Sequence, residues 1–148
     1  MDNILEIKDL IVRYETEDGV VEAVNSVNLS LRQGAAVGLV GETGAGKTTL
    51  AKSILRLIQW PPGRIVSGQI FYNGKDLTAI SEEEMCKIRG NDISMIFQDP
   101  MTSLNPVYSV GDQIAEVIHQ HEKCSKEEGR RKAGDMLEMV GIPRARYD

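Results

Sequence analysis

Residues 41–48 read GETGAGKT, a full match to the pattern G-x-x-x-x-G-K-[ST]. The apolar run of residues 35–40 precedes this segment, and apolar side chains recur at helical spacing over residues 47–58 after it. The order predicts a buried parallel strand, a tight loop and an amphipathic helix. Because glycines free the backbone to turn its N–H groups inward, the loop is expected to cradle phosphate groups.

Each part of this loop has an expected role in phosphate binding. The positive end of the following helix attracts anions. Lys47 is expected to supply a charge for the β- and γ-phosphates, and the Thr48 hydroxyl to ligate Mg²⁺. The loop residues expected to bind the nucleotide are Gly41, Glu42, Thr43, Gly44, Ala45, Gly46, Lys47 and Thr48. ATPases, GTPases and small-molecule kinases share such a loop, so it leaves the class of nucleotide protein open.

Strand signals lie on both sides of the loop. Residues 3–14 and 20–31 are rich in Val, Ile and Leu with partial alternation, which predicts an antiparallel hairpin. A further strand is expected over residues 65–72, where an Asn-Gly turn follows. Residues 93–97 (ISMIF) read as a second buried strand.

Helix signals dominate the second half. Serine followed three residues later by Glu or Asp predicts helices over residues 82–89, 110–122 and 126–140. Gly129 and Gly134 weaken the last helix, because each costs about 1 kcal/mol relative to alanine in a helix interior.

Composition excludes several classes of protein. The 148 residues carry 17 basic and 22 acidic side chains, a net charge of −5, and no basic cluster typical of nucleic-acid binding. Cys86 and Cys124 lack C-x-x-C spacing, which argues against a zinc site or a disulfide scaffold. Neither a signal peptide nor a run of about 18 apolar residues is visible, so we expect a cytoplasmic protein.

The sequence matches two of the three classes of nucleotide-binding protein, the GTPases and the small-molecule kinases, poorly. A GTPase is expected to carry D-x-x-G and N-K-x-D motifs, and neither occurs in the sequence. Small-molecule kinases usually have the loop close to the N-terminus, whereas about 40 residues of predicted hairpin precede it here.

Three strings narrow the class further: GETGAGKTT at 41–49, SGQIFYNGKDL at 67–77 and MIFQDPMTSLNPVYSVGDQI at 95–114. With the hairpin, they resemble the ATP-binding subunit of an ABC transporter, in the oligopeptide/dipeptide importer branch that includes nickel importers. The resemblance implies an α/β fold, a P-loop NTPase core of ABC type with an N-terminal antiparallel β hairpin. It also implies two parts, a nucleotide-binding core over residues 1–100 and the beginning of a helical subdomain over residues 101–148.

The resemblance assigns further site residues, with ATP and Mg²⁺ as cofactors. Gln98 matches the family's Q-loop glutamine, so it is expected to join Lys47 in catalysis and Thr48 in binding Mg²⁺. Tyr14 resembles the aromatic residue that stacks on adenine, and Thr49 the residue that hydrogen-bonds the α-phosphate. A neutral amide at the end of a parallel strand suits the Q-loop role, because it can reach a metal–phosphate centre.

Other family motifs are missing from these 148 residues. There is no L-S-G-G-Q signature, no four-apolar-Asp-Glu segment and no switch histidine after it. The chain therefore resembles the N-terminal part of a subunit, ending just before the signature. We expect it to bind nucleotide and to hydrolyse it negligibly by itself.

The resemblance implies an ATP hydrolase that, as a full-length subunit, couples ATP to the uptake of peptides or nickel. Implied partners are a second ABC ATPase subunit, permease subunits contacted through loop 98–108 and the helical subdomain, and, indirectly, an extracytoplasmic binding protein. The expected location is peripheral, on the cytoplasmic face of the membrane. One alternative is a soluble ABC-type ATPase in DNA repair or translation, which the acidic charge disfavours. A non-catalytic regulatory fragment is the other.

Overall fold

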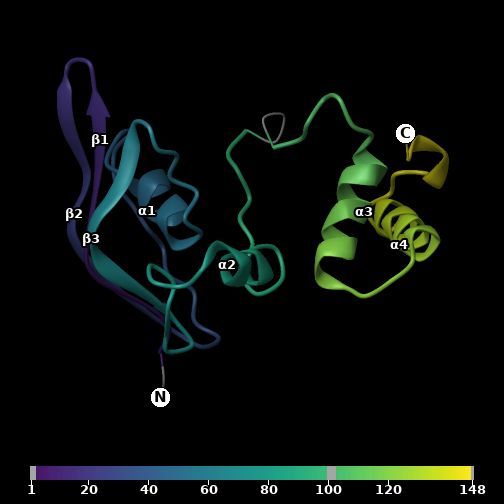
Figure 1. The fold of residues 1–148 in the computed structure, drawn as a ribbon, viewed down its shortest axis with the longest axis horizontal. Helices are drawn as coiled ribbons and strands as arrows, with labels where there is room; N and C mark the ends of the chain where they lie inside the picture. The colour runs from purple at the N-terminus through teal and green to yellow at the C-terminus, as the bar shows by residue number, and fades with distance from the viewer. Residues whose placement is uncertain (1–2, 100–102, 148) are drawn as a thin grey trace. The chain divides into compact units, whose positions relative to one another are not determined.

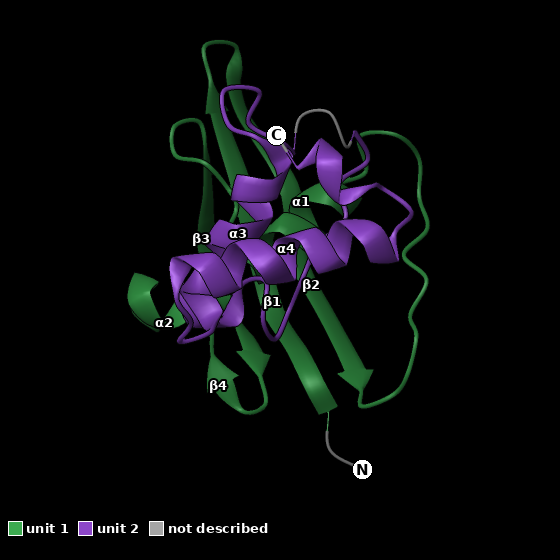
Figure 2. Cartoon of the chain, turned by 90° about the vertical axis from the view of Figure 1, so that its right-hand side faces the viewer, with its two compact units in different colours: residues 1–85 green, residues 86–148 purple. Residues whose placement is uncertain are grey.

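The structure, a computed structural model, describes residues 3–99 and 103–147 (Figure 1). The chain forms two compact units, residues 1–85 (unit 1) and 86–148 (unit 2) (Figure 2). Each unit has its own buried residues. The boundary expected at residue 100, between the nucleotide-binding core and the helical subdomain, is a functional division that these two units do not test, so it stays a prediction.

Unit 1 is built on a four-stranded antiparallel sheet in the order β2-β1-β3-β4. The strands are β1 (Asn3–Thr16), β2 (Gly19–Arg32), β3 (Gly63–Tyr72) and β4 (Lys75–Asp76). The predicted hairpin and the predicted strand over 65–72 are confirmed, each with ends extended by one or two residues.

A bulge explains why alternation along the first strand is only partial. Leu5 and Ile7 are buried, and so are Leu10 and Val12, so the buried positions change parity between residues 7 and 10. The register of β1 against β2 shifts there, and Asp9 has a φ of 47°. One extra residue in a strand resets which side chains face the core.

Side chains and a glycine hold this bulge. The Asp9 N–H donates to Asn28 Oδ1 at 3.0 Å, and Asn28 Nδ2 donates to Asp9 Oδ1 at 2.9 Å. On β3, the other strand that pairs with β1, Gly68 has a φ of +93°, and a methyl group there would lie 2.6 Å from the Asp9 carbonyl oxygen. Close backbone approach thus requires glycine at position 68.

The helix α1 (Lys47–Ile54) covers part of the sheet with Leu50, and Leu55 is buried after its last turn. The helix expected to reach residue 58 ends four residues earlier. Arg56 adopts a φ of 52°, the Arg56 N–H donates to the Ser53 carbonyl, and the Leu57 N–H donates to the Lys52 carbonyl. These are the bonds of a Schellman motif, here with arginine where glycine is usual, so local geometry ends the helix before the prolines.

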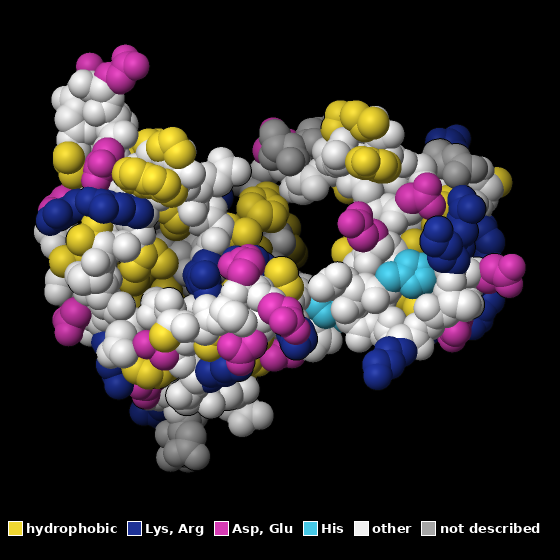
Figure 3. All heavy atoms as spheres, viewed as in Figure 1, with side chains coloured by type: hydrophobic (Ala, Val, Ile, Leu, Met, Phe, Trp, Pro, Cys, Tyr) yellow, Lys and Arg dark blue, Asp and Glu magenta, His cyan; other side chains and the backbone are white. Residues whose placement is uncertain are grey.

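The two predicted parallel strands, 35–40 and 93–97, are wrong for this structure. Neither forms a strand, and their apolar side chains reach the surface, with Val40 94% and Ile96 98% exposed. A strand requires a neighbouring strand to receive its hydrogen bonds, and no described strand forms a ladder of hydrogen bonds with either segment. The bridge between Arg89 and Ile93 is isolated. Exposed hydrophobic side chains appear on the surfaces of both units (Figure 3).

The three predicted helices are present, each one residue shorter at its C-terminus: α2 (Glu82–Ile88), α3 (Val110–His121) and α4 (Lys126–Met139). Their predicted caps form. Ser109 Oγ accepts from the Asp112 N–H and Ser125 Oγ from the Glu128 N–H, both at 3.2 Å. A short 3-10 helix, η2 (Arg144–Arg146), follows α4.

The core of unit 2 explains the two glycines of α4. Gly129 and Gly134 are both buried. A methyl group at Gly129 would lie 2.6 Å from the His119 ring, and one at Gly134 would lie 3.1 Å from Arg144 Nε. Ala115, Ile118 and Ala133 form the buried cluster beside them. The helix propensity lost at the glycines is therefore offset by close packing of α4 against α3 at Gly129 and against η2 at Gly134.

Candidate nucleotide-binding site

The loop of residues 41–46 leads directly into α1, and two of its glycines are required by geometry. Gly44 and Gly46 have φ values of 85° and 82°, which glycine tolerates far better than other residues. A Cβ atom at Gly46 would also overlap the carbonyl oxygen of Ala23 in β2. Backbone conformation and the neighbouring strand thus both exclude a side chain at position 46.

Lys47 is the first residue of α1, and its ammonium group lies across the loop. Its Nζ donates to the carbonyl oxygens of Gly41 and Glu42, at 2.6 Å each. An ammonium has three protons to donate, so these bonds fix its position and leave one donor for a phosphate oxygen. The half-buried Lys47 is therefore held where the loop backbone turns.

The N-terminus of α1 suits an anion. Gly46 is the N-cap and makes no side-chain capping bond, and the first turn contains no acidic residue. The first N–H groups of a helix lack partners within the helix and carry partial positive charge. Loop residues 41–45 and Thr48 are exposed. These features fit a phosphate chain, with the Thr48 hydroxyl accessible as an oxygen ligand for Mg²⁺.

Tyr14 and Thr49 are brought together by the fold. The Tyr14 hydroxyl lies 3.4 Å from Thr49 Oγ1, joining β1 to the first turn of α1. The Thr49 carbonyl accepts a hydrogen bond from Ser53 Oγ at 2.7 Å. Both side chains are half-buried. An aromatic ring thus lies beside the helix that begins at the phosphate loop.

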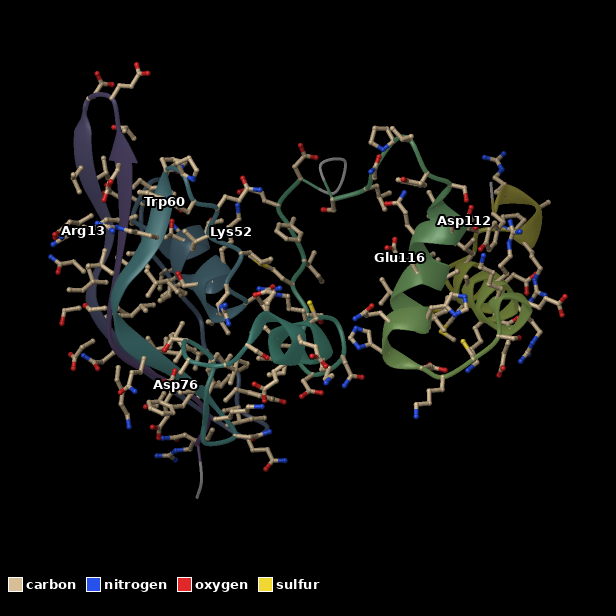
Figure 4. All side chains as sticks on the ribbon, in the orientation of Figure 1. Arg13, Lys52, Trp60, Asp76, Asp112 and Glu116 are labelled. Carbon is tan, nitrogen blue, oxygen red and sulfur yellow. The ribbon has the colours of Figure 1, made fainter. Side chains whose placement is uncertain are left out.

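Gly63 was missed as a site residue by sequence reasoning. It is the cross-strand partner of Tyr14 in the sheet, and the Tyr14 ring lies against it. Only the register of β1 on β3 reveals this pairing, and the bulge in β1 hides that register from a simple count along the sequence. Figure 4 shows Trp60 near the start of the same strand, β3.

Gln98 belongs to unit 2, where it is exposed at a bend of the chain. Lys47 and Thr48 belong to unit 1. The expected meeting of Gln98 with the metal and with Lys47 therefore stays a prediction.

The expected partner-binding loop, residues 98–108, is described only in part, since residues 100–102 lie outside the described residues. Its second half is tied to α3 by Gln113. The Gln113 amide accepts from the Asn105 N–H at 2.9 Å and donates to the carbonyls of Asn105 and Tyr108 at 2.9 and 3.1 Å. This part of the loop thus has a defined conformation on the helix.

Two other expectations concern metals and membranes. Cys86 and Cys124 are both free thiols. Within residues 3–99 and 103–147 no cluster of three or more His, Cys, Asp or Glu residues could hold a metal ion. In the same described part, none of the helices combines the length and the apolar character needed to cross a bilayer.

The glycine loop and the lysine at the start of α1 are the features of a phosphate-loop NTPase. A family model described as "ABC transporter" matches residues 24–148. The chain therefore belongs to the ABC transporter family, as its sequence motifs indicated.

Two relatives have names that state peptide transport. The oligopeptide transport ATP-binding protein OppD of Bacillus subtilis (strain 168) is 49% identical over 140 residues, which is 95% of this chain and 39% of the relative. The dipeptide transport ATP-binding protein DppD of the same organism is 43% identical over 97% of this chain and 43% of the relative. The chain thus spans about two fifths of the length of these relatives.

Solved structures show the same fold. The ATP-binding cassette MJ0796, in a dimeric post-hydrolysis state bound to ADP and Pi, aligns with a TM-score of 0.75 at 21% identity, over 97% of this chain and 60% of that chain. The cbiO1 protein of Clostridium perfringens, part of the ABC transporter complex cbiONQ, aligns with a TM-score of 0.63 at 23% identity. The expected ABC-type fold class is confirmed.

Proposed function

We propose that this chain is the nucleotide-binding part of an ABC importer subunit that couples ATP binding and hydrolysis to peptide uptake. One observation carries the proposal: Lys47 Nζ and the anion-attracting start of α1 lie together at a glycine loop. The substrate class rests on relatives whose names state oligopeptide and dipeptide transport. Those names favour peptides over nickel.

The phosphate chain of ATP would be bound by the backbone N–H groups of residues 41–46 and by the Lys47 ammonium. Thr49 would donate its hydroxyl to the α-phosphate, and the Tyr14 ring would stack on adenine. The Tyr14–Thr49 contact of 3.4 Å supports this pair of roles, because it joins the expected base site to the expected phosphate site. Mg²⁺, held by Thr48 and Gln98, would neutralise charge on the phosphates.

Gln98 would sense the γ-phosphate from unit 2 and pass that signal to the helices α3 and α4. The described part of loop 98–108, tied to α3 through Gln113, supports a role in meeting permease subunits. A second ATPase subunit and, indirectly, an extracytoplasmic binding protein complete the proposed assembly, which is peripheral on the cytoplasmic face of the membrane. This stretch of sequence carries no L-S-G-G-Q motif, so we propose that it binds ATP and hydrolyses it negligibly.

The alternative, a soluble ABC-type ATPase acting in DNA repair or translation, is not favoured. The acidic net charge of −5 offers no clustered Lys and Arg for nucleic-acid phosphates. The matched relatives are named for peptide transport.

Calorimetric titration of the 148-residue chain with Mg-ATP tests the central claim. Lys47→Ala is expected to weaken ATP binding about 10- to 150-fold, because a hydrogen bond to a charged group contributes roughly 1.5–3 kcal/mol. Lys52→Ala is the matched control, since Lys52 lies on the same helix, in its last turn (Figure 4). Equal ATP affinity in the Lys47 and Lys52 variants would refute phosphate binding at this loop.

A further inference from the structure

Gly63 occupies a position where backbone conformation does not call for glycine. It is buried in β3 opposite Tyr14, and its φ lies outside the left-handed region. Alanine could adopt the same backbone there, so the reason for glycine must be space.

The space beside Gly63 is filled by the Tyr14 ring. A methyl carbon on Gly63 would lie 2.6 Å from Tyr14 Cε1, 2.9 Å from Tyr14 Cδ1 and 2.8 Å from Ile58 Cγ2. Carbon atoms in contact prefer about 3.5–4.0 Å. The ring and any side chain at position 63 therefore exclude each other.

The backbone around Gly63 is held from two sides, which prevents it from moving away. The Gly63 N–H donates to the Gln59 carbonyl at 2.9 Å, and the Glu15 N–H donates to the Pro62 carbonyl at 2.8 Å. At its other end the ring is held by the contact of 3.4 Å between the Tyr14 hydroxyl and Thr49 Oγ1. An added methyl group would have to displace the Tyr14 ring and the Ile58 side chain rather than the strand.

We propose that Gly63 is a positioning residue for the base of a bound nucleotide. By leaving room at the β3 backbone, it lets Tyr14 take the orientation in which its hydroxyl reaches α1 and its half-buried ring is ordered before ligand arrives. An ordered ring binds a base without the entropic cost of fixing it. The inference rests on the proposed function, in which Tyr14 stacks on adenine.

The experiment compares two ligands on the 148-residue chain by calorimetry: ATP, and inorganic tripolyphosphate, which has the phosphates but no base. Base stacking on an aromatic residue contributes about 5- to 150-fold in affinity. Gly63→Ala is expected to lower ATP affinity by about tenfold, within that range, and to leave tripolyphosphate affinity unchanged. Gly38→Ala is the matched control, because Gly38 has an ordinary φ and open space around it.

Combination with Tyr14→Ala makes the test specific for the ring. In the Tyr14→Ala background, Gly63→Ala should have a smaller effect on ATP affinity and on the melting temperature than it has in the parent chain. This comparison remains informative if Gly63→Ala alone unfolds the protein, because removal of the ring should then restore folding.

The outcomes separate this inference from the proposed function. If Tyr14→Ala lowers the ratio of ATP to tripolyphosphate affinity and Gly63→Ala does not, the role of Gly63 is overturned and the stacking role of Tyr14 stands. A loss of both ligands to the same degree, with no recovery in the double variant, also overturns it. If Tyr14→Ala leaves the ratio unchanged, the stacking role fails, and the inference fails with it.

Discussion

Gly46→Ala is expected to be among the most damaging single substitutions in unit 1, because two separate costs combine at this position. The φ of 82° costs an alanine roughly 1–2 kcal/mol relative to glycine. The added Cβ would also overlap the Ala23 carbonyl of β2, a backbone atom that cannot rotate away. Forced overpacking of this kind costs typically about 1–3 kcal/mol. Together they amount to roughly 2–5 kcal/mol, a large share of the 5–15 kcal/mol that stabilises a typical domain.

Gly44→Ala separates the two costs. Gly44 has nearly the same φ, 85°, and no atom within 4 Å of its missing Cβ. Its substitution by alanine should therefore cost only the conformational term, roughly 1–2 kcal/mol. The difference between the variants, roughly 1–3 kcal/mol, measures the clash with β2.

Urea unfolding followed by tryptophan fluorescence provides the measurement. Trp60 is the only tryptophan of the chain and belongs to unit 1, so its signal reports on the unit that contains the loop. If Gly46→Ala proves no less stable than Gly44→Ala, the close approach of β2 to the loop is wrong. The argument that the sheet determines the conformation of the loop then fails.

Three further outcomes are expected. Ser125→Ala should cost about 1 kcal/mol by removing the N-cap of α4, and hydrogen exchange should speed up first in that helix. Burial acts to raise the pKa of Asp76, but hydrogen bonds from Thr78 and Gln69 outweigh it and hold the pKa below its ordinary value of 3.8. Ionised Asp76 therefore stabilises the folded protein. This stabilisation is present above the unfolded-state pKa and is lost as pH falls through the lower folded-state pKa. Urea midpoints of the parent chain and Asp76→Asn should thus converge in acid, whereas a constant difference down to the lowest pH would contradict the argument. Gly129→Ala should lower the melting temperature through the contact of 2.6 Å with the His119 ring, and His119→Ala should relieve most of that loss.

Short sequence patterns such as helix caps and turns predicted local structure well, because the interactions behind them join residues only a few positions apart. The serine caps of α3 and α4 and the hairpin of β1 and β2 form where the sequence patterns place them. Caps and turns need only their own segment to be satisfied. Residues 41–46 likewise form the expected loop at the start of a helix.

Non-local features could not be read from the pattern. An apolar run such as 35–40 has strand character, but the strand forms only when a neighbour accepts its hydrogen bonds. The early end of α1 at Ile54 depends on Arg56 in the left-handed conformation, a position where glycine is usual. The pairing of Tyr14 with Gly63 depends on register, which bulges in β1 shift by whole residues.

The antiparallel sheet meets the start of α1 at two points, and this bears on how a nucleotide would be recognised. The Ala23 carbonyl of β2 lies against Gly46, where the expected phosphate site begins. The Tyr14 hydroxyl of β1 lies beside Thr49, in the first turn of the helix. Paired neighbouring strands hold their relative positions through a ladder of hydrogen bonds. The distance between the expected base site and the expected phosphate site is therefore determined by the sheet, so a change in the β1–β2 hairpin should alter nucleotide affinity without touching the loop.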